Sequence, residues 1–223
     1  MDLVLVLITI TISLIAYFYI NNIFKKYKKK KSNCELSGFE VARKILDKYE
    51  LNDVYITEIS GKYSDNYNDE RKVVKLSKNV FHDNSITSIG IAAYESVYAL
   101  EDHDKKPFYK YRSVYYKIAK FLAVLGILFI ILGIFFDLRR YSIILLGIVF
   151  EMVVLIMYII TLKVEFECAR RCLDELLDLS LINKDENDSI KDVLSACCYK
   201  NIAFIVNNIT EFCLAIYNYG KAS

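Results

Sequence analysis

Three long apolar segments interrupt the mixed pattern of polar and hydrophobic positions along the chain. Leu3–Ile20 contains no charged residue, and the one charged residue of Ser142–Ile160 is Glu151. Phe121–Phe136 is also apolar but slightly shorter. A helix rises about 1.5 Å per residue, so about 20 apolar residues cross a hydrocarbon core of roughly 30 Å. The pattern predicts a mostly α-helical, multi-pass membrane protein, with an N-terminal transmembrane anchor over residues 1–24 and a transmembrane helical hairpin over residues 121–160.

Charge next to the first apolar segment predicts its orientation. Lys25–Lys31 holds six lysines in seven residues, whereas Asp2 is the one charged side chain before the segment. Basic flanks favour the cytoplasmic side, so we expect a cell-membrane protein whose main polar region is cytoplasmic. Arg139 and Arg140 would then lie outside, against the same rule, but the six lysines outweigh them. A signal peptide is the alternative reading, yet no basic residue precedes the segment and no small-residue cleavage site follows it.

The region over residues 25–120 is predicted to be a cytosolic α+β portion. Ser37 and Glu40 have the spacing of a capping box, and apolar residues recur behind them at helical intervals, which indicates a helix. Val54–Ile59 and Lys72–Leu76 have strand composition and flank a polar stretch typical of turns. We therefore expect a small β-hairpin there.

A second helix in this region, capped at Asn84 or Ser85, carries the sequence Tyr94-Glu95-x-x-Tyr98. Positions i and i+4 lie about 40° apart on one helix face. In the zinc-protease pattern His-Glu-x-x-His, that face brings two imidazoles to one metal ion and the glutamate activates water. Taken alone, the tyrosine version is a weak signal, since two aromatic residues at helical spacing more often pack in a core.

The C-terminal region, residues 161–223, is also predicted to be helical. Glu165–Leu179 has the pattern of a cytosolic helix that continues or follows the second hairpin helix. A polar segment, Asn183–Lys191, precedes a helical run to Tyr219 that carries several polar residues. This last run either spans the membrane or packs against the other helices with its polar face inward.

Composition adds the expected partners. The net charge is +2, and the basic excess is confined to the lysine cluster, which we expect to contact anionic membrane lipid. Nucleic acid is not an expected partner, because the cluster adjoins a membrane segment and no reading module accompanies it. All six cysteines fall in cytosolic or membrane segments, where disulfides are rare, so most are expected to be small buried hydrophobic residues: Cys34, Cys168, Cys172, Cys197, Cys198 and Cys213.

Several short stretches, taken in order, carry a family resemblance: Leu36-Ser37-Gly38, Asp65-Asn66-Tyr67-Asn68, Arg71 to Ser77, Ala92-Ala93-Tyr94-Glu95, Arg112-Ser113 and Val164 to Arg171. With the anchor and its basic end, their order and spacing resemble the bacterial integral-membrane neutral zinc metallopeptidase family, the YugP-like family. The resemblance covers nearly the whole chain. It implies a zincin-like cytosolic portion built around the motif helix.

The same resemblance implies roles for four residues. In that family the motif helix is similar to Ala-Ala-His-Glu-x-x-His-Ala-Leu, so Tyr94 and Tyr98 stand at both histidine positions of a degenerate motif. Glu95 stands at the general-base position. Glu165 stands where a third, carboxylate ligand of zinc would come from a later helix.

The two replacements predict that the zinc of the family is lost and that no cofactor is bound. A neutral imidazole offers a lone pair at pH 7, whereas a phenol with a pKa near 10 must first lose its proton. Glu165 would be the one inherited ligand, and catalytic zinc uses three. The leading hypothesis is a pseudoenzyme: a non-catalytic pseudopeptidase with a vestigial Glu95, binding a peptide or membrane protein at the cytoplasmic membrane face. The alternatives are an active zinc metallopeptidase with substituted ligands and a structural membrane subunit.

Other residues could rebuild a metal site. Cys168 and Cys172 are four positions apart, and His82 and His103 are the two histidines of the chain. A cysteine pair on one helix face is more often a packing feature than a ligand pair. We therefore do not expect a rebuilt site.

Two further positions are candidates for binding. Glu151 is a possible intramembrane polar site, because an ionisable residue inside a membrane segment is a functional candidate; the alternative is a protonated acid hydrogen-bonded within the bundle. Val73–Leu76 is a candidate edge strand for a bound peptide, or it simply completes a small sheet.

Overall fold

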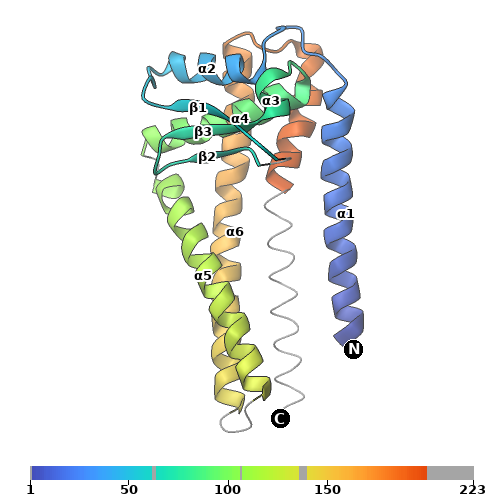
Figure 1. Ribbon diagram of the computed structural model, residues 1–223, viewed down its shortest axis with the longest axis vertical. Coiled ribbons are helices and arrows are strands. Elements are labelled where there is room, and N and C mark those ends of the chain that lie inside the picture. Colours follow the sequence, from blue (N-terminus) through green and yellow to red (C-terminus); the bar gives the residue numbers. More distant parts are fainter. Residues whose placement is uncertain (1, 62–63, 106, 136–139, 200–223) are drawn as a thin grey trace. The chain divides into compact units, whose positions relative to one another are not determined.

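The computed structural model describes residues 2–61, 64–105, 107–135 and 140–199 (Figure 1). The chain divides into two compact units. Unit 1 comprises Met1–Phe18, Tyr111–Lys163 and Lys200–Ser223, and unit 2 comprises Tyr19–Lys110 and Val164–Tyr199.

The described residues of each of the three apolar segments lie in a long helix: α1 (Asp2–Lys28), α5 (Pro107–Phe135) and α6 (Arg140–Asp178). The mostly α-helical fold is therefore confirmed. Among the described residues, the stretch Ser142–Asp178 is the one helix long and apolar enough to cross a membrane. Membrane crossing by α1 and α5 stays a prediction. Residues 136–139, which lie between the two helices of the predicted hairpin, are outside the described residues.

In unit 1, α5 and α6 approach closely at two glycines. A Cβ placed on Gly147 would lie 2.8 Å from the backbone oxygen of Gly126 and 3.1 Å from the backbone nitrogen of Ile130. Glu151 follows one turn later on α6 and is fully buried. A Cβ on Gly126 would lie 3.3 Å from Glu151 Cγ. The candidate intramembrane acid is therefore enclosed against α5, in space that a glycine leaves open.

In unit 2, α2 (Gly38–Lys48) begins where the capping box predicts. The Ser37 hydroxyl accepts the Glu40 backbone N–H at 3.3 Å, and the Glu40 carboxylate accepts the Ser37 backbone N–H at 2.7 Å. These two bonds satisfy backbone donors that the first turn of a helix leaves without partners. Behind the cap, α2 buries an apolar stripe and packs against α4; the stripe consists of Val41, Ala42, Ile45 and Leu46.

A three-stranded sheet lies beside these helices (Figure 1). Its strands are β1 (Tyr55–Ile59), β2 (Asn66–Asn68) and β3 (Val73–Ser77), in the order β1-β3-β2. β1 is parallel to β3, and β2 is antiparallel to it. The predicted hairpin of Val54–Ile59 with Lys72–Leu76 is therefore wrong.

The error has a physical reason. The polar stretch expected to be a turn contains β2, which reverses the chain so that β3 enters the sheet in the same direction as β1. The hairpin in this fold is formed by β2 and β3. Because β3 is the central strand, Val73–Leu76 is not a free edge, and its candidate role as a peptide-binding edge is also wrong.

The motif helix is α4 (Ile86–His103), which follows the short α3 (Lys78–His82). Ser85 is its N-cap, as predicted, and the Ser85 hydroxyl accepts the Ser88 backbone N–H at 3.3 Å. Every residue of α4 from Ile86 to Glu101 is buried. A helix that is enclosed on all sides forms the centre of a core, and α4 is the central helix of unit 2.

The predicted helix at Glu165–Leu179 is a continuation of α6. A 3-10 turn, Lys184–Glu186, follows and leads into a helix over residues 187–199. Residues 200–219 of the predicted last run, with Cys213, lie outside the described residues. Among the described residues the other five cysteines form no disulfides, and all but Cys34 are buried, in agreement with the prediction.

Candidate functional site

The tyrosines of the motif project from α4 into the interior of unit 2. Tyr94 is 3% exposed and Tyr98 is 4% exposed. Their rings meet edge to face with centroids 5.0 Å apart, as the i, i+4 spacing requires. Tyr98 also lies beside Tyr109 of α5, at a centroid distance of 5.8 Å. The two hydroxyls therefore lie side by side in a protein interior.

Glu165 of α6 lies directly against both hydroxyls. The Tyr94 hydroxyl donates a hydrogen bond of 2.6 Å to Glu165 Oε2, and the Tyr98 hydroxyl donates to the same oxygen. Glu165 is only 2% exposed. Three residues that the resemblance places at one metal site, Tyr94, Tyr98 and Glu165, thus converge on one point.

The two protons available decide how the cluster is bonded. The Tyr94 and Tyr98 hydroxyl oxygens are 3.0 Å apart, so a bond between them is also within reach. Each phenol has one O–H, so two phenols cannot form all three bonds at once. Bonds to a carboxylate are about twice as strong as bonds between neutral groups. We infer that both protons point to Glu165.

Burial keeps Tyr94 in its phenol form. Removal from water raises the pKa of Tyr94 well above its ordinary value near 10, and the adjacent Tyr98 and Glu165 groups raise it further. Cys198 completes this side of the cluster: its Sγ lies 3.8 Å from the Tyr94 hydroxyl and 3.5 Å from the Glu165 backbone oxygen. At neutral pH Tyr94 is therefore a donor and not an anionic ligand.

This donor set does not fit a catalytic zinc ion. Zinc needs lone pairs from about three protein ligands, whereas both phenol protons here are directed at the one carboxylate. Among the residues that the structure describes, no group of three or more His, Cys, Asp or Glu side chains is placed to hold a metal ion. His82 and His103, with Cys168 and Cys172, are not brought together with Glu165 into such a group.

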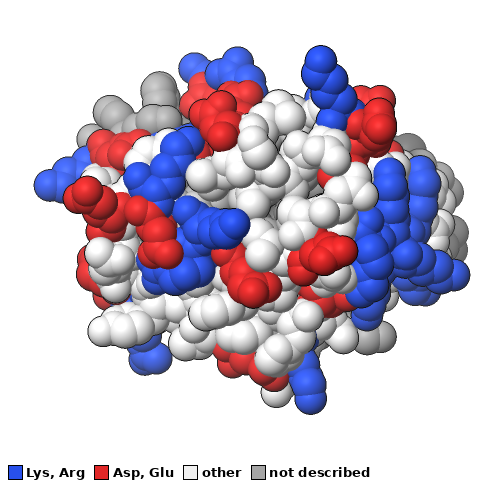
Figure 2. Space-filling view, turned by 90° about the horizontal axis from the view of Figure 1, so that it is seen from above, with Lys and Arg blue, Asp and Glu red and all other residues white. Residues whose placement is uncertain are grey.

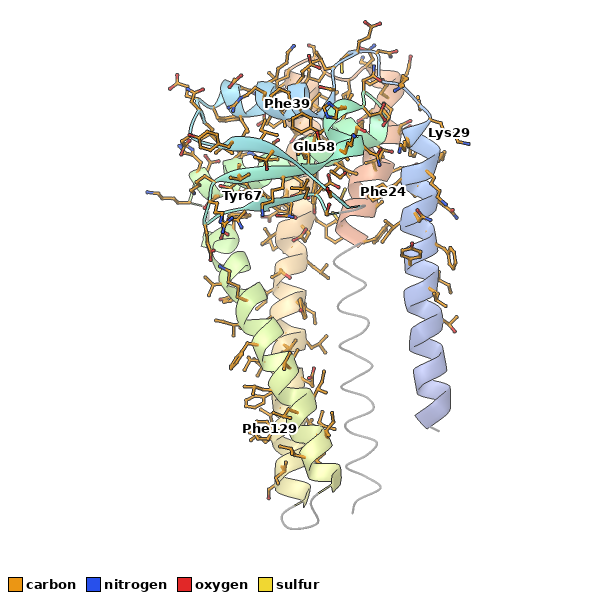
Figure 3. The ribbon with its side chains drawn as sticks, in the orientation of Figure 1. Phe24, Lys29, Phe39, Glu58, Tyr67 and Phe129 are labelled. Carbon is orange, nitrogen blue, oxygen red and sulfur yellow. The ribbon has the colours of Figure 1, made fainter. Side chains whose placement is uncertain are left out.

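Glu95 is placed differently from a free general base. Its side chain is 9% exposed, and Oε2 accepts the backbone N–H of Tyr67 at 3.0 Å. Tyr67 is the middle residue of β2, the strand at one edge of the sheet (Figure 3). The Tyr67 hydroxyl in turn donates to Asp102 at 2.8 Å. Glu95 therefore caps an edge-strand amide, which is a structural use of a carboxylate.

Comparison with known proteins agrees with the family resemblance of the sequence. Residues 2–219 match the model of a family described as "putative neutral zinc metallopeptidase". The chain belongs to this family. A relative described as "Putative membrane protease YugP", from Bacillus subtilis (strain 168), is 29% identical over 196 residues, which are 88% of this chain and 86% of the relative. No solved structure matches the chain.

Sequence reasoning did not find two contacts of the site. Cys198 lies next to Tyr94, although more than one hundred positions separate them in the sequence. The adjacent cysteines Cys197 and Cys198 gave no reason to expect this contact. Tyr67 donates its backbone N–H to Glu95, and a pattern of side chains in the sequence cannot predict a backbone contact of this kind. Both contacts depend on tertiary packing.

Proposed function

We propose that this chain is a non-catalytic member of the neutral zinc metallopeptidase family. It acts as a binding or scaffold protein, anchored in the cell membrane by several helices with its main polar region on the cytoplasmic side. The observation that carries this proposal is the bonding of Tyr94 and Tyr98 to one oxygen of Glu165. The family resemblance implies that these three residues stand at the metal site, which supports a loss of the metal ion.

Two further features support the proposal. The Glu95 Oε2 atom accepts the Tyr67 backbone N–H, so this carboxylate already has a structural partner in the sheet. Without a metal ion, nothing else in this cluster would lower the pKa of water or polarise a peptide carbonyl. The cluster instead joins α4 to α6, so the former catalytic frame serves as a structural crosslink.

Metal content and activity of the full chain in detergent test the proposal. We expect far less than one zinc per chain by mass spectrometry of the metal, and no peptide hydrolysis above that of Glu95→Gln. Stoichiometric zinc together with cleavage that Glu95→Gln abolishes would establish the alternative, an active peptidase with substituted ligands.

A reversion tests the same idea from the other direction. Tyr94→His with Tyr98→His supplies two imidazoles beside Glu165, which completes three ligands at one point. We expect this double variant to bind one zinc per chain, and the same variant with Glu165→Gln to bind much less. Zinc binding by wild type and double variant to the same extent would contradict the proposed loss of the site.

A further inference from the structure

A pocket separate from the tyrosine cluster opens within unit 2 at the end of α1. It has a volume of about 190 Å³ and lies between α1, α3, the end of β3 and the first turns of α4. Ligand pockets for drug-sized molecules are roughly 300–1,000 Å³. This pocket therefore suits a small group, such as one lipid phosphate or one amino-acid side chain.

The lining of the pocket is amphipathic. Phe24, Val80 and Ile91 supply apolar surface, and Lys25 and Lys28 supply positive charge from α1. Hydroxyl and amide groups complete the lining: Asn21, Ser77, Asn79, Thr87 and Ser88. The combination suits an anionic group that is attached to an apolar body.

One carboxylate, Asp65, also lines the pocket, and its negative charge would repel an anionic ligand. Its side chain is 5% exposed, and Oδ1 accepts the Ser77 backbone N–H at 2.6 Å. That bond directs the negative charge into the end of the sheet. Lys25 and Lys28, by contrast, are both exposed.

The lysines near the pocket differ in whether other side chains of the protein pair with them. Basic side chains gather on one side of the face shown in Figure 2. Within the lysine cluster of residues 25–31, Lys26 lies 3.9 Å from Asp192, Lys30 donates to Ser189 at 3.0 Å, and Lys31 pairs with Asp83. Among the described residues no such partner is recorded for Lys25 or Lys28. These two lysines also line a second, more open hollow along α1.

The pocket walls are held together before any ligand arrives. The Thr87 hydroxyl donates to the Phe24 backbone oxygen at 3.0 Å. The Ile86 N–H donates to the Lys30 backbone oxygen at 2.9 Å, and the Ser32 N–H donates to the Asn84 backbone oxygen at 2.9 Å. These bonds fix the end of α1 against the start of α4. A preformed site loses little conformational entropy on binding.

The position of the pocket along α1 indicates its depth relative to a membrane. Exposed aromatic side chains, Tyr17 (56%), Phe18 (56%) and Tyr19 (47%), precede the lysines on the same helix. Aromatic residues concentrate where a membrane meets water, and lysines extend from there toward the headgroups. Lys25 lies about 9 Å further along the helix than Tyr19, at 1.5 Å per residue.

We propose that this pocket binds the phosphate headgroup of an anionic membrane lipid, with Lys25 and Lys28 as its charge partners. The apolar lining contacts the hydrocarbon of the lipid that adjoins its headgroup. The site rests on the membrane location proposed above and is independent of the loss of catalysis.

A fluorescent reporter tests the site directly. The chain contains no tryptophan, so Asn79→Trp places a single tryptophan at the exposed mouth of the pocket. In vesicles, brominated phosphatidylglycerol should quench this tryptophan more than brominated phosphatidylcholine at equal content. Lys25→Gln with Lys28→Gln should weaken the preference about tenfold or more, since each lysine near a membrane surface contributes appreciably to anionic lipid binding.

The matched control removes the same charge elsewhere. Lys29 belongs to the same lysine cluster (Figure 3) and Lys44 is an exposed lysine of α2; neither lines this pocket. Lys29→Gln with Lys44→Gln should leave the preference nearly unchanged. Retention of phosphatidylglycerol over phosphatidylcholine by the wild-type chain in native mass spectrometry checks the same preference without the reporter.

Several outcomes would overturn the site. Equal loss in the two lysine pairs would show a diffuse charge effect and not a pocket. Displacement of the lipid by millimolar inorganic phosphate would show a general anion site, and displacement by a soluble acidic peptide would show a peptide site. A chain that does not float with vesicles would overturn the membrane location as well, whereas a floating chain without lipid preference would overturn the pocket alone.

Discussion

Tyr94 donates a 2.6 Å hydrogen bond to Glu165, a residue 71 positions away in the sequence. The contact joins the central helix of unit 2 to α6 at a point that is 2–3% exposed. A phenol proton makes this connection directly. In the proposed function it replaces the metal-mediated connection that the family resemblance implies.

Removal of the shared carboxylate should destabilise the protein. Glu165→Leu keeps a similar volume but leaves the Tyr94 and Tyr98 hydroxyls without this acceptor. A buried donor that loses its acceptor costs about 1–3 kcal/mol, so the free energy of unfolding should fall by at least that amount. Denaturant unfolding in detergent measures the change. Glu167→Leu, at an exposed position two residues later, should stay within about 0.5 kcal/mol of wild type.

The two tyrosines should act as a coupled pair. Tyr94→Phe or Tyr98→Phe alone leaves the other hydroxyl to donate to Glu165, so each should cost about 1 kcal/mol. The double variant removes both donors from one buried carboxylate. It should therefore cost more than the sum, with a coupling energy in the range of about 0.5–3 kcal/mol. A double-mutant cycle on the unfolding free energy measures this; strictly additive values would contradict the shared acceptor.

The sequence predicted correctly where helices α2 and α4 begin, because a helix cap depends on residues that are close together in the sequence. The Ser37 box and the Ser85 cap are of this kind, because the bonds that form them span three residues. β2 was missed, since it is only three residues long, two of them asparagine, and it exists through its pairing with β3. The consequence was a wrong sheet topology.

The site shows the same division. The i, i+4 spacing alone placed Tyr94 and Tyr98 on one face, because helix geometry fixes that relation. Glu165 could be assigned only through the family resemblance, since nothing in its own surroundings indicates which helix it meets. The bond from the Tyr67 amide to Glu95 was beyond prediction, because it depends on the position of a strand that the sequence pattern did not reveal.

Alkaline pH should expose the role of the buried phenol. The pKa of Tyr94 is raised in the folded protein, so the folded state keeps this proton when the unfolded chain, with a pKa near 10, has lost it. Stability contributed by Tyr94 is thus complete below about pH 10 and falls as the pH rises above it. The stability advantage of wild type over Tyr94→Phe should shrink above that pH and stay constant below it.

Unfolding free energies of both proteins across the alkaline range provide the measurement. Tyr55→Phe is the control, because the Tyr55 side chain is 67% exposed on β1. Its difference from wild type should show no comparable fall. A constant difference between wild type and Tyr94→Phe up to pH 11, roughly one unit above the ordinary tyrosine pKa, would contradict the prediction.

The two glycines of unit 1 should differ in their tolerance of a methyl group. A Cβ on Gly147 meets backbone atoms of α5, at 2.8 Å from the Gly126 oxygen and 3.1 Å from the Ile130 nitrogen. Backbone cannot move aside cheaply, so Gly147→Ala should force α5 and α6 apart and cost about 1–3 kcal/mol. A Cβ on Gly126 meets chiefly the carboxyl end of Glu151, at 2.5 Å from Oε1. That end can rotate, so Gly126→Ala should cost less.

Unfolding in mixed micelles compares the two variants, and a second substitution identifies the cause. If Glu151 is the obstacle to a methyl group at Gly126, then Glu151→Ala removes it, and Gly126→Ala should cost less in the Glu151→Ala background than in wild type. The cost of Gly147→Ala should persist in that background, because its obstacles are the Ile130 side chain and backbone atoms of α5, none of which belongs to Glu151. Equal costs for both glycines, unaffected by Glu151→Ala, would contradict the predicted difference between the two positions.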